Sequence, residues 1–516
     1  MAGTITAGGK RAAGAPGPRV RGAASGAGDP AGAAPPPAST SAPDGPRRRR
    51  PRRERHWTVP AVLRAALTGC LALTLALGAL CAAIPLHTSG SWSSIQQRLA
   101  PQVRHASGLY LALTDMDAET ANILVFGDAK DLSANRAQAV KLYAKDRDAV
   151  STELQGATRS AGNDASAQAA LVQILDGLGQ YEELASRATS LNDQANALAG
   201  HPAPAALTAY RQATDLMRES LLPSANKLID ANNTTFTATY DDERGLLSDL
   251  RWAALGLGVL TLAALVALQL FITRRFRRVI NPALAAATLL CVTVIGTVVT
   301  MAGDEQQQLG VARHDAFDSV VALSAARAVG YDANADESRN LLDPQRSGDY
   351  SDAFFEKSQK IADIDGSSLQ TYSSDIASAQ RAYLADHNDV RFTGYLGTEF
   401  RNITFPGERS AAERALSAWV GYERADHTTR GYATDGRLDQ AIRFNTSWDK
   451  GGSNYTFQQW DDAMKDDIAI NDRAFGAAVS NGRSELDSAL VLVVAGTALA
   501  LGLAVLGVRL RLREFS

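Results

Sequence analysis

The chain has 516 residues, and its 52 Lys and Arg against 55 Asp and Glu leave a net charge of −3. This near balance gives no overall field that would attract nucleic acid, and the length allows three or four ordinary domains. Cys70, Cys81 and Cys291 all lie in apolar runs, which excludes a disulfide framework in the soluble parts.

The N-terminal 46 residues are rich in Gly, Ala, Pro and Ser, as in "AGAAPPPASTSAPDGP". They offer few large apolar side chains to bury, so residues 1–56 are expected to be a disordered arm that ends in the basic run "RRRRPRRER". That run is either a topology signal attracted to anionic lipid, at about 1 kcal/mol per residue, or a docking site for an acidic partner. The topology described next favours the first interpretation.

Four uncharged apolar stretches are long enough to cross a membrane. A helix needs about 20 apolar residues to span a hydrocarbon core of roughly 30 Å. The stretches are residues 65–84, 252–272, 282–301 and 489–508.

Arginine-rich flanks give all four stretches one orientation, because cytoplasmic flanks retain positive charge. The basic run precedes the first stretch, "RRFRR" joins the second to the third, and Arg509, Arg511 and Arg513 follow the fourth. We therefore expect a multi-pass protein of the plasma membrane with both termini in the cytoplasm. Residues 85–251 and 302–488 then lie outside, and residues 273–281 and 509–516 form an inner turn and a tail.

Both outer segments have the pattern of long helices, and strand signatures are scarce. In the first segment, the 4,3 spacing of a helix seam is kept by Leu109, Leu113, Met116, Thr120 and Ile123. The simplest fold for each segment is an antiparallel four-helix bundle whose end helices continue into the membrane. The predicted fold class is an all-α membrane protein with four transmembrane helices and two extracytoplasmic helical bundles, arranged as a tandem sensor-like repeat.

The second outer segment places charges on a helix stripe that should be buried. The stripe is Val321, Ala325, Ala328, Asp332, Ala335, Arg339 and Leu342. A carboxylate and a guanidinium therefore occupy positions that should face a core. If both are structural, replacing Asp332 alone by alanine should destabilise this bundle, and replacing Asp332 and Arg339 together by leucine should restore it.

An internal repeat connects the two halves of the chain. An offset of 217 residues places the first span on the third, and "DMDAETANILV" from Asp115 on "DANADESRNLL" from Asp332. Asp115 then corresponds to Asp332, and Glu119 corresponds to Asp336. We interpret this as a duplication of a unit made of a span, an outer bundle and a second span. Chance alignment of two acidic, alanine-rich helices is the alternative.

No motif for catalysis is present: the sequence has no phosphate loop, no metal-spaced Cys or His set, no HExxH and no GxSxG. We therefore expect neither an enzyme nor a bound cofactor or metal. Asp115 and Glu119 share one helix face while Asp117 points away from it, which favours a solvated face. As candidates for binding a partner or ligand, the acidic motifs supply Asp115, Glu119, Asp332, Asp336, Glu337 and Arg339.

Aromatic residues gather in the second outer segment. They are Trp419, Tyr422, Phe444, Trp448, Tyr455, Phe457 and Trp460. The stretch "NTSWDKGGSNYTFQQW" breaks the helical period there, so the sequence predicts either a contact loop or a small core beneath it.

The cytoplasm receives only the arm, one basic turn and the tail "RLRLREFS", which are too short to form a catalytic domain. The spans lack charge and helix breaks, which argues against a solute path. We therefore expect a transmembrane coupler whose cytoplasmic docking site is Arg274, Arg275, Arg277 and Arg278. The alternative is an accessory or permease-like subunit of a transport or export complex, although the inner turn is short for a helix that contacts an ATPase. Association into a homo-oligomer is left open.

The four spans, the basic inner turn, and the motifs "LYLALTDMDAETANILVFG" and "GYDANADESRNLLD" resemble the GlnX-type membrane proteins of actinobacteria, over residues 57–513. The resemblance implies two partners: an extracytoplasmic amino-acid-binding lipoprotein of the GlnH type, and a cytoplasmic serine/threonine kinase of the PknG type. The protein would relay the occupancy of the first to the second.

The predicted topology can be tested by chemical labelling. Cysteines placed at Ser190 and at Ser417 should both react with a membrane-impermeant maleimide in intact cells, whereas a cysteine at Thr273 should not, because the arginine flanks hold that turn inside. Labelling at Thr273 together with protection at the other two positions would contradict the topology.

Overall fold

The computed structural model describes residues 59–162, 164–276 and 280–512. In these ranges every regular element is a helix and no strand occurs, which confirms the all-α fold class. The arm over residues 1–56, Arg277, Arg278 and the end of the tail from Arg513 were predicted from the sequence but lie outside the described residues.

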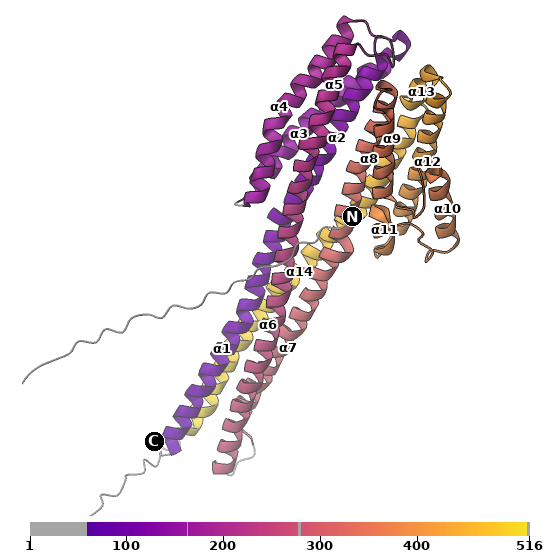
Figure 1. The fold of residues 1–516 in the computed structure, drawn as a ribbon. Coiled ribbons are helices and arrows are strands. Elements are labelled where there is room, and N and C mark those ends of the chain that lie inside the picture. Colours follow the sequence, from indigo (N-terminus) through magenta and orange to yellow (C-terminus); the bar gives the residue numbers. More distant parts are fainter. Residues whose placement is uncertain (1–58, 163, 277–279, 513–516) are drawn as a thin grey trace, which may run out of the picture. The chain divides into compact units, whose positions relative to one another are not determined.

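Four long helices carry the four predicted spans. Each is apolar and long enough to cross a membrane, which indicates a membrane protein. They run over Val59–Phe126, Pro204–Arg275, Pro282–Leu342 and Ser453–Arg509, with 68, 72, 61 and 57 residues. Since each helix is much longer than a bilayer is thick, each continues from the apolar stretch into an outer bundle without a break (Figure 1).

Three of these helices contain a short π-helical turn. The first consists of α1 (Val59–Ser94), η1 (Ile95–Leu99) and α2 (Ala100–Phe126). The second consists of α5 (Pro204–Leu216), η3 (Met217–Leu221) and α6 (Leu222–Phe276). The third consists of α7 (Pro282–Gly310), η4 (Val311–Phe317) and α8 (Asp318–Leu342), and the fourth is α14 (Ser453–Leu512).

The first bundle is a four-helix bundle, as predicted. The short η2 (Lys130–Leu132) and then α3 (Ser133–Ser160) and α4 (Ala165–Gln194) follow α2, and α5 with the start of α6 completes the bundle (Figure 1). The carboxylate of Asp164 caps α4, because its Oδ1 accepts from the backbone N–H groups of Ser166 (2.9 Å) and Ala167 (3.0 Å).

The second bundle is more elaborate than the predicted four helices. Its long members are α8, α9 (Ser347–Ile361), α12 (Glu408–Thr434) and α14, and three short helices are added: α10 (Tyr372–Ala385), α11 (Gly394–Arg401) and α13 (Leu438–Asn445). Glycine permits one of these additions. Gly394 begins α11 at φ 74°, and a Cβ there would lie 2.6 Å from the carbonyl oxygen of Lys360.

The aromatic residues of this bundle mostly form its core. Trp419, Tyr422, Phe457 and Trp460 are buried together, whereas Trp448 is 39% exposed. Of the two predictions for this region, the core is the one that the structure supports for these four residues.

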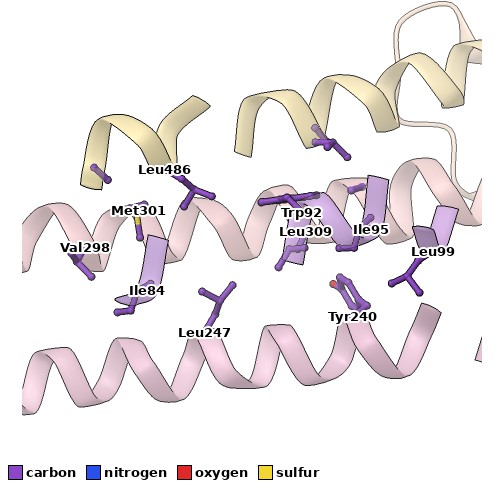
Figure 2. Close-up of a cluster of buried hydrophobic side chains, with 14 of the residues drawn as sticks. Ile84, Trp92, Ile95, Leu99, Tyr240, Leu247, Val298, Met301, Leu309 and Leu486 are labelled. Carbon is purple, nitrogen blue, oxygen red and sulfur yellow. The ribbon is translucent and has the colours of Figure 1, made fainter. Parts of the chain in front are cut away.

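A third core fills the junction between the apolar stretches and the bundles. Ile84, Trp92, Leu247, Met301 and Leu486 come from α1, α6, α7 and α14, and their side chains point into the space between these helices (Figure 2). At the same level the Trp92 indole donates to the Glu305 carboxylate at 2.7 Å. A movement of one helix at this level therefore meets the packed side chains of the others.

The positions of the π turns support the predicted duplication. The offset of 217 residues that aligns the first and third spans places Ile95–Leu99 on residues 312–316, which lie inside η4 (Val311–Phe317). A π turn inserts an extra residue and is uncommon. Its recurrence at one offset is therefore hard to attribute to chance similarity of two alanine-rich helices.

Candidate functional site

The two bundles meet along α2 and α8, which pack against each other. Residues 116–127 of the first half and 332–339 of the second are buried on every side of their helices. Each of these helices faces its own bundle on one side and the other bundle on the opposite side. Polar residues that would be solvated on an isolated bundle are therefore enclosed here.

Arg339 lies at the centre of this contact and is fully buried. Its guanidinium pairs with Asp117 on α2, with Asp336 one turn earlier on α8, and with Asp332 at 3.3 Å. Its Nε donates to the hydroxyl of Tyr210 on α5 at 3.3 Å. One side chain thus bonds to helices of both bundles.

Further groups complete the charge balance. Lys357 on α9 pairs with Asp332 at 2.8 Å and also with Asp336. The Tyr181 hydroxyl on α4 donates to Asp117 at 2.8 Å. We call the set the interbundle network: Asp117, Tyr181, Tyr210, Asp332, Asp336, Arg339 and Lys357. It holds three carboxylates against two cations.

The electrostatics of the network keep Asp332 ionised. Burial by itself would raise the pKa of Asp332, but the charges of Lys357 and Arg339 outweigh it, so the pKa lies below its usual value. The buried carboxylates around Arg339 likewise raise its pKa against the effect of burial. The prediction that Asp332 and Arg339 occupy a buried stripe is confirmed.

A second polar layer lies beside the network and includes two more predicted residues. Glu119 accepts from the Asn122 amide at 3.3 Å, and the Asn122 carbonyl accepts from Ser338 across the bundle contact at 2.7 Å. Glu337, next to Ser338, accepts from the hydroxyl of Ser453 at 3.0 Å. Burial raises the pKa of Glu119 to about 8 and that of Glu337 to about 7.

The predicted solvated face on α2 is wrong. Glu119 is buried and Asp115 is half-buried, because α2 is covered by α3 as well as by α8. Burial and the nearby carboxylate of Asp146 on α3 raise the pKa of Asp115 well above its usual value. Asp117, expected to point away from the acidic face, instead points at Arg339.

The structure thus brings Asp332, Asp336 and Arg339 into one network, places Glu119 and Glu337 in the layer beside it, and leaves Asp115 outside both. The sequence gave no sign of the network's Tyr181, Tyr210 and Lys357, which come from helices far apart in the chain. Of the predicted docking residues, Arg274 and Arg275 are exposed in the last turn of α6.

A separate group of buried carboxylates lies in the second bundle, formed by Glu399 on α11, Glu408 on α12 and Asp467 on α14. We call it the acid cluster. Glu408 accepts from the backbone N–H groups of Thr404 (2.6 Å) and Phe405 (2.8 Å), which favours its ionised form. Within the described ranges, none of the three carboxylates forms an ion pair with a cation.

Protons take the place of those cations. Burial, followed by the neighbouring Glu408, raises the pKa of Glu399 to about 7, while hydrogen bonds from Ser319 and Asn471 oppose the rise. Burial, then Glu399 and Glu408, raises the pKa of Asp467 to about 9, and the more distant Arg414 lowers it only in part. In the residues that the structure describes, no group of His, Cys, Asp and Glu is placed to hold a metal ion.

Comparison with known proteins identifies the first bundle. Residues 91–241 match the family described as Actinobacterial sensor domain. No curated protein and no solved structure matches the chain. The match and the four membrane-length helices together support a sensor-type actinobacterial membrane protein with a role in sensing or signalling.

Removal of Arg339 should be far more costly than removal of an exposed arginine at the same contact. Arg339→Met leaves Asp117 buried without its cation, and we expect a loss of roughly 3–5 kcal/mol in the free energy of unfolding. Arg346→Met is the matched control, because its pair with Asp215 at 2.7 Å is about two-fifths exposed; a loss of about 1 kcal/mol or less is expected there.

Thermal unfolding of the purified full chain measures both variants. The structure also changes the expectation for the double leucine variant. With Asp332 and Arg339 replaced together, Asp117 still lacks a cation, so the double variant should remain unstable. Equal unfolding midpoints for Arg339→Met and Arg346→Met would contradict the network's role.

The acid cluster should make stability fall as pH rises. Because Glu399 and Asp467 hold protons more tightly when folded, their contribution is fully present below the unfolded pKa values, near 4, and is lost as pH rises through about 7 and then about 9. Asp467→Asn should remove on the order of 2 kcal/mol of this loss between pH 5 and pH 9.

The control for this measurement is Asp462→Asn, on the same helix but 56% exposed. Unfolding midpoints of the three proteins are compared across the pH range. A pH profile of Asp467→Asn that follows those of the wild type and of Asp462→Asn would show that the cluster holds no proton of consequence.

Proposed function

We propose that this protein is a non-enzymatic transmembrane signalling coupler. A single observation carries the proposal: Arg339 lies on the same unbroken helix, Pro282–Leu342, as the third span, and its partner Asp117 lies on Val59–Phe126 with the first span. A change in the contact between the two bundles therefore acts directly on two membrane helices.

The distances favour transmission by rigid helices. Arg339 lies 38 residues beyond the end of the third span at Met301, which is roughly 55 Å of helix at 1.5 Å per residue. Small rotations or shifts of packed helices are a common mode of signalling, because packed interfaces have discrete arrangements. The π turns η1 and η4 lie between the spans and the network, where a local change of helical winding would alter register.

The cytoplasmic side of the proposal rests on the arginine flanks. Both termini lie in the cytoplasm, in a multi-pass arrangement of the plasma membrane. Between Phe276 at the end of α6 and Pro282 at the start of α7 only five residues remain, too few for an inner domain. The output must therefore pass to a separate protein that docks on short basic segments.

The identity of the partners follows from the resemblance to GlnX-type proteins. It supports an extracytoplasmic solute-binding lipoprotein as the input and a cytoplasmic serine/threonine kinase as the output, with an amino acid as the sensed solute. The match of residues 91–241 to a sensor domain agrees with an input on the first bundle.

Substitution of the inner arginines tests the docking step. With Arg274, Arg275, Arg277 and Arg278 changed to lysine, insertion should be retained, because lysine also obeys the positive-inside bias. Lysine lacks the planar fork that binds a carboxylate or phosphate in two places, so the variant should recover less of the cytoplasmic partner in a pull-down from membranes.

Salt provides the internal control, since charge-mediated docking weakens as the Debye length falls below about 8 Å. The wild type should therefore lose its partner as salt is raised, and retention of the outer partner shows that the variant is intact. Equal recovery of the cytoplasmic partner by both proteins, at low and at high salt, would reduce the arginine turn to a topology signal.

A further inference from the structure

A cleft of about 630 Å³ opens on the second bundle, away from the interbundle network. The last turn of α8, α9 and α12 border it, together with the loop before α10. Leu341, Leu369 and Leu438 give it an apolar wall, and Ser351, Gln370 and Arg430 supply polar groups. This size and this mixture are typical of a site for a small solute.

The guanidinium of Arg430 is held in place with one nitrogen unused. Its Nε donates to both oxygens of Asp426 (3.0 and 2.8 Å), its Nη1 donates to Ser351 on α9 (2.7 Å), and it lies 4.5 Å from the ring centre of Phe354. Its Nη2 is buried and has no hydrogen-bond partner. An unpaired buried donor costs about 1–3 kcal/mol, which an acceptor entering from the cleft would remove.

The charges around the cleft leave an excess of positive charge. Asp426 neutralises Arg430, and Asp435 at the rim pairs with Arg437 at 2.6 Å. The neighbouring Glu423 is neutral at ordinary pH, because burial and then the charge of Asp426 raise its pKa well above the usual value. The acids that face the cleft are therefore already paired or protonated.

A second hollow, of about 300 Å³, adjoins the cleft and shares Gln370 and His427 with it. Arg381 on α10 and Arg424 on α12 line this hollow. Among the described residues, neither arginine forms an ion pair with a carboxylate. An anion that approaches the cleft thus meets two free guanidinium groups at its entrance.

We infer that this cleft binds a small organic acid, whose carboxylate reaches Arg430 and whose apolar body lies along Leu341, Leu369 and Leu438. A planar guanidinium with a fixed orientation suits a carboxylate. A free phosphate has no apolar body for that wall, and the cleft offers its charge only one buried cation. The ligand's other polar groups meet the side chains of Ser351 and Gln370.

Occupancy of the cleft bears on the interbundle network through two helices. Asn340 and Leu341 border the cleft directly after Arg339 on α8, and Ser351 lies on α9, which also carries Lys357. A ligand in the cleft therefore touches both helices that supply the network's cations. The binding claim itself does not rest on the coupler function, because it concerns the purified chain without partners.

Calorimetric titration of the purified full chain tests the inference, with succinate as the probe at constant ionic strength. Succinate should bind, and its uncharged dimethyl ester and inorganic phosphate should bind at least about tenfold more weakly, a difference of about 1.4 kcal/mol. Arg430→Lys should weaken succinate binding by about tenfold or more, because lysine cannot reproduce the fork. The matched control is Arg414→Lys, an exposed arginine on the same helix outside the cleft, which should bind as the wild type does.

A second pair of variants covers the case in which Arg430→Lys unfolds. Arg381→Ala and Arg424→Ala are exposed changes in the adjoining hollow, and each should weaken succinate binding by a few fold, with the effect shrinking as salt rises. Phosphate binding as tight as succinate, or no loss in either exposed variant, would overturn the inference. Absence of any heat with succinate up to about 10 mM would also overturn it, since weaker affinity carries less than about 3 kcal/mol.

Discussion

The ion pair between Arg339 and Asp117 constrains the whole extracytoplasmic part, because it joins the two helices that carry the first and third spans. Two buried ions rarely gain net stability over a packed apolar pair, so this pair is better explained by position than by energy. Arg339 has further acids on its own helix, Asp332 and Asp336. If α2 moved away, these would keep the guanidinium neutralised, while Tyr181 would still donate to Asp117. The contact can therefore have two arrangements without exposing a bare charge.

The junction core and the π turns decide how such a change would reach the membrane. Trp92 fills the space beside Gly482 of α14, where a Cβ would come within 2.7 Å of its indole nitrogen, and it bonds Glu305 of α7. Packing this close resists sideways displacement, so α1 and α7 are left with rotation or sliding along their axes. A π turn already holds an extra residue at that level in both helices, which makes a change of winding the least costly local adjustment.

Sequence patterns predicted the helices, the four spans and the buried stripe, because periodicity and length are local properties. They failed at Asp117 and Glu119 for one physical reason: a single-bundle view gives each helix one buried face, and here α2 and α8 are enclosed on all sides. The uninterrupted small and apolar residues of "TANILVF" around these acids are a signal that could have shown it. Lys357 and Tyr210 had no signal, since only the tertiary fold brings α9 and α5 to Arg339.

The duplicated frame explains why α2 pairs with α8 and with no second copy of itself. At the offset of 217 residues, Arg339 corresponds to Asn122, and Asp117 corresponds to Asn334. Each half therefore has a neutral amide where the other half has its charged partner. Two copies of α8 face to face would bring two buried guanidinium groups together, and two copies of α2 would do the same with carboxylates, each at a cost of several kcal/mol. Divergence of a few polar positions after duplication thus turned a repeated unit into a specific pair, and only an unlike pair can report a change in one half to the other.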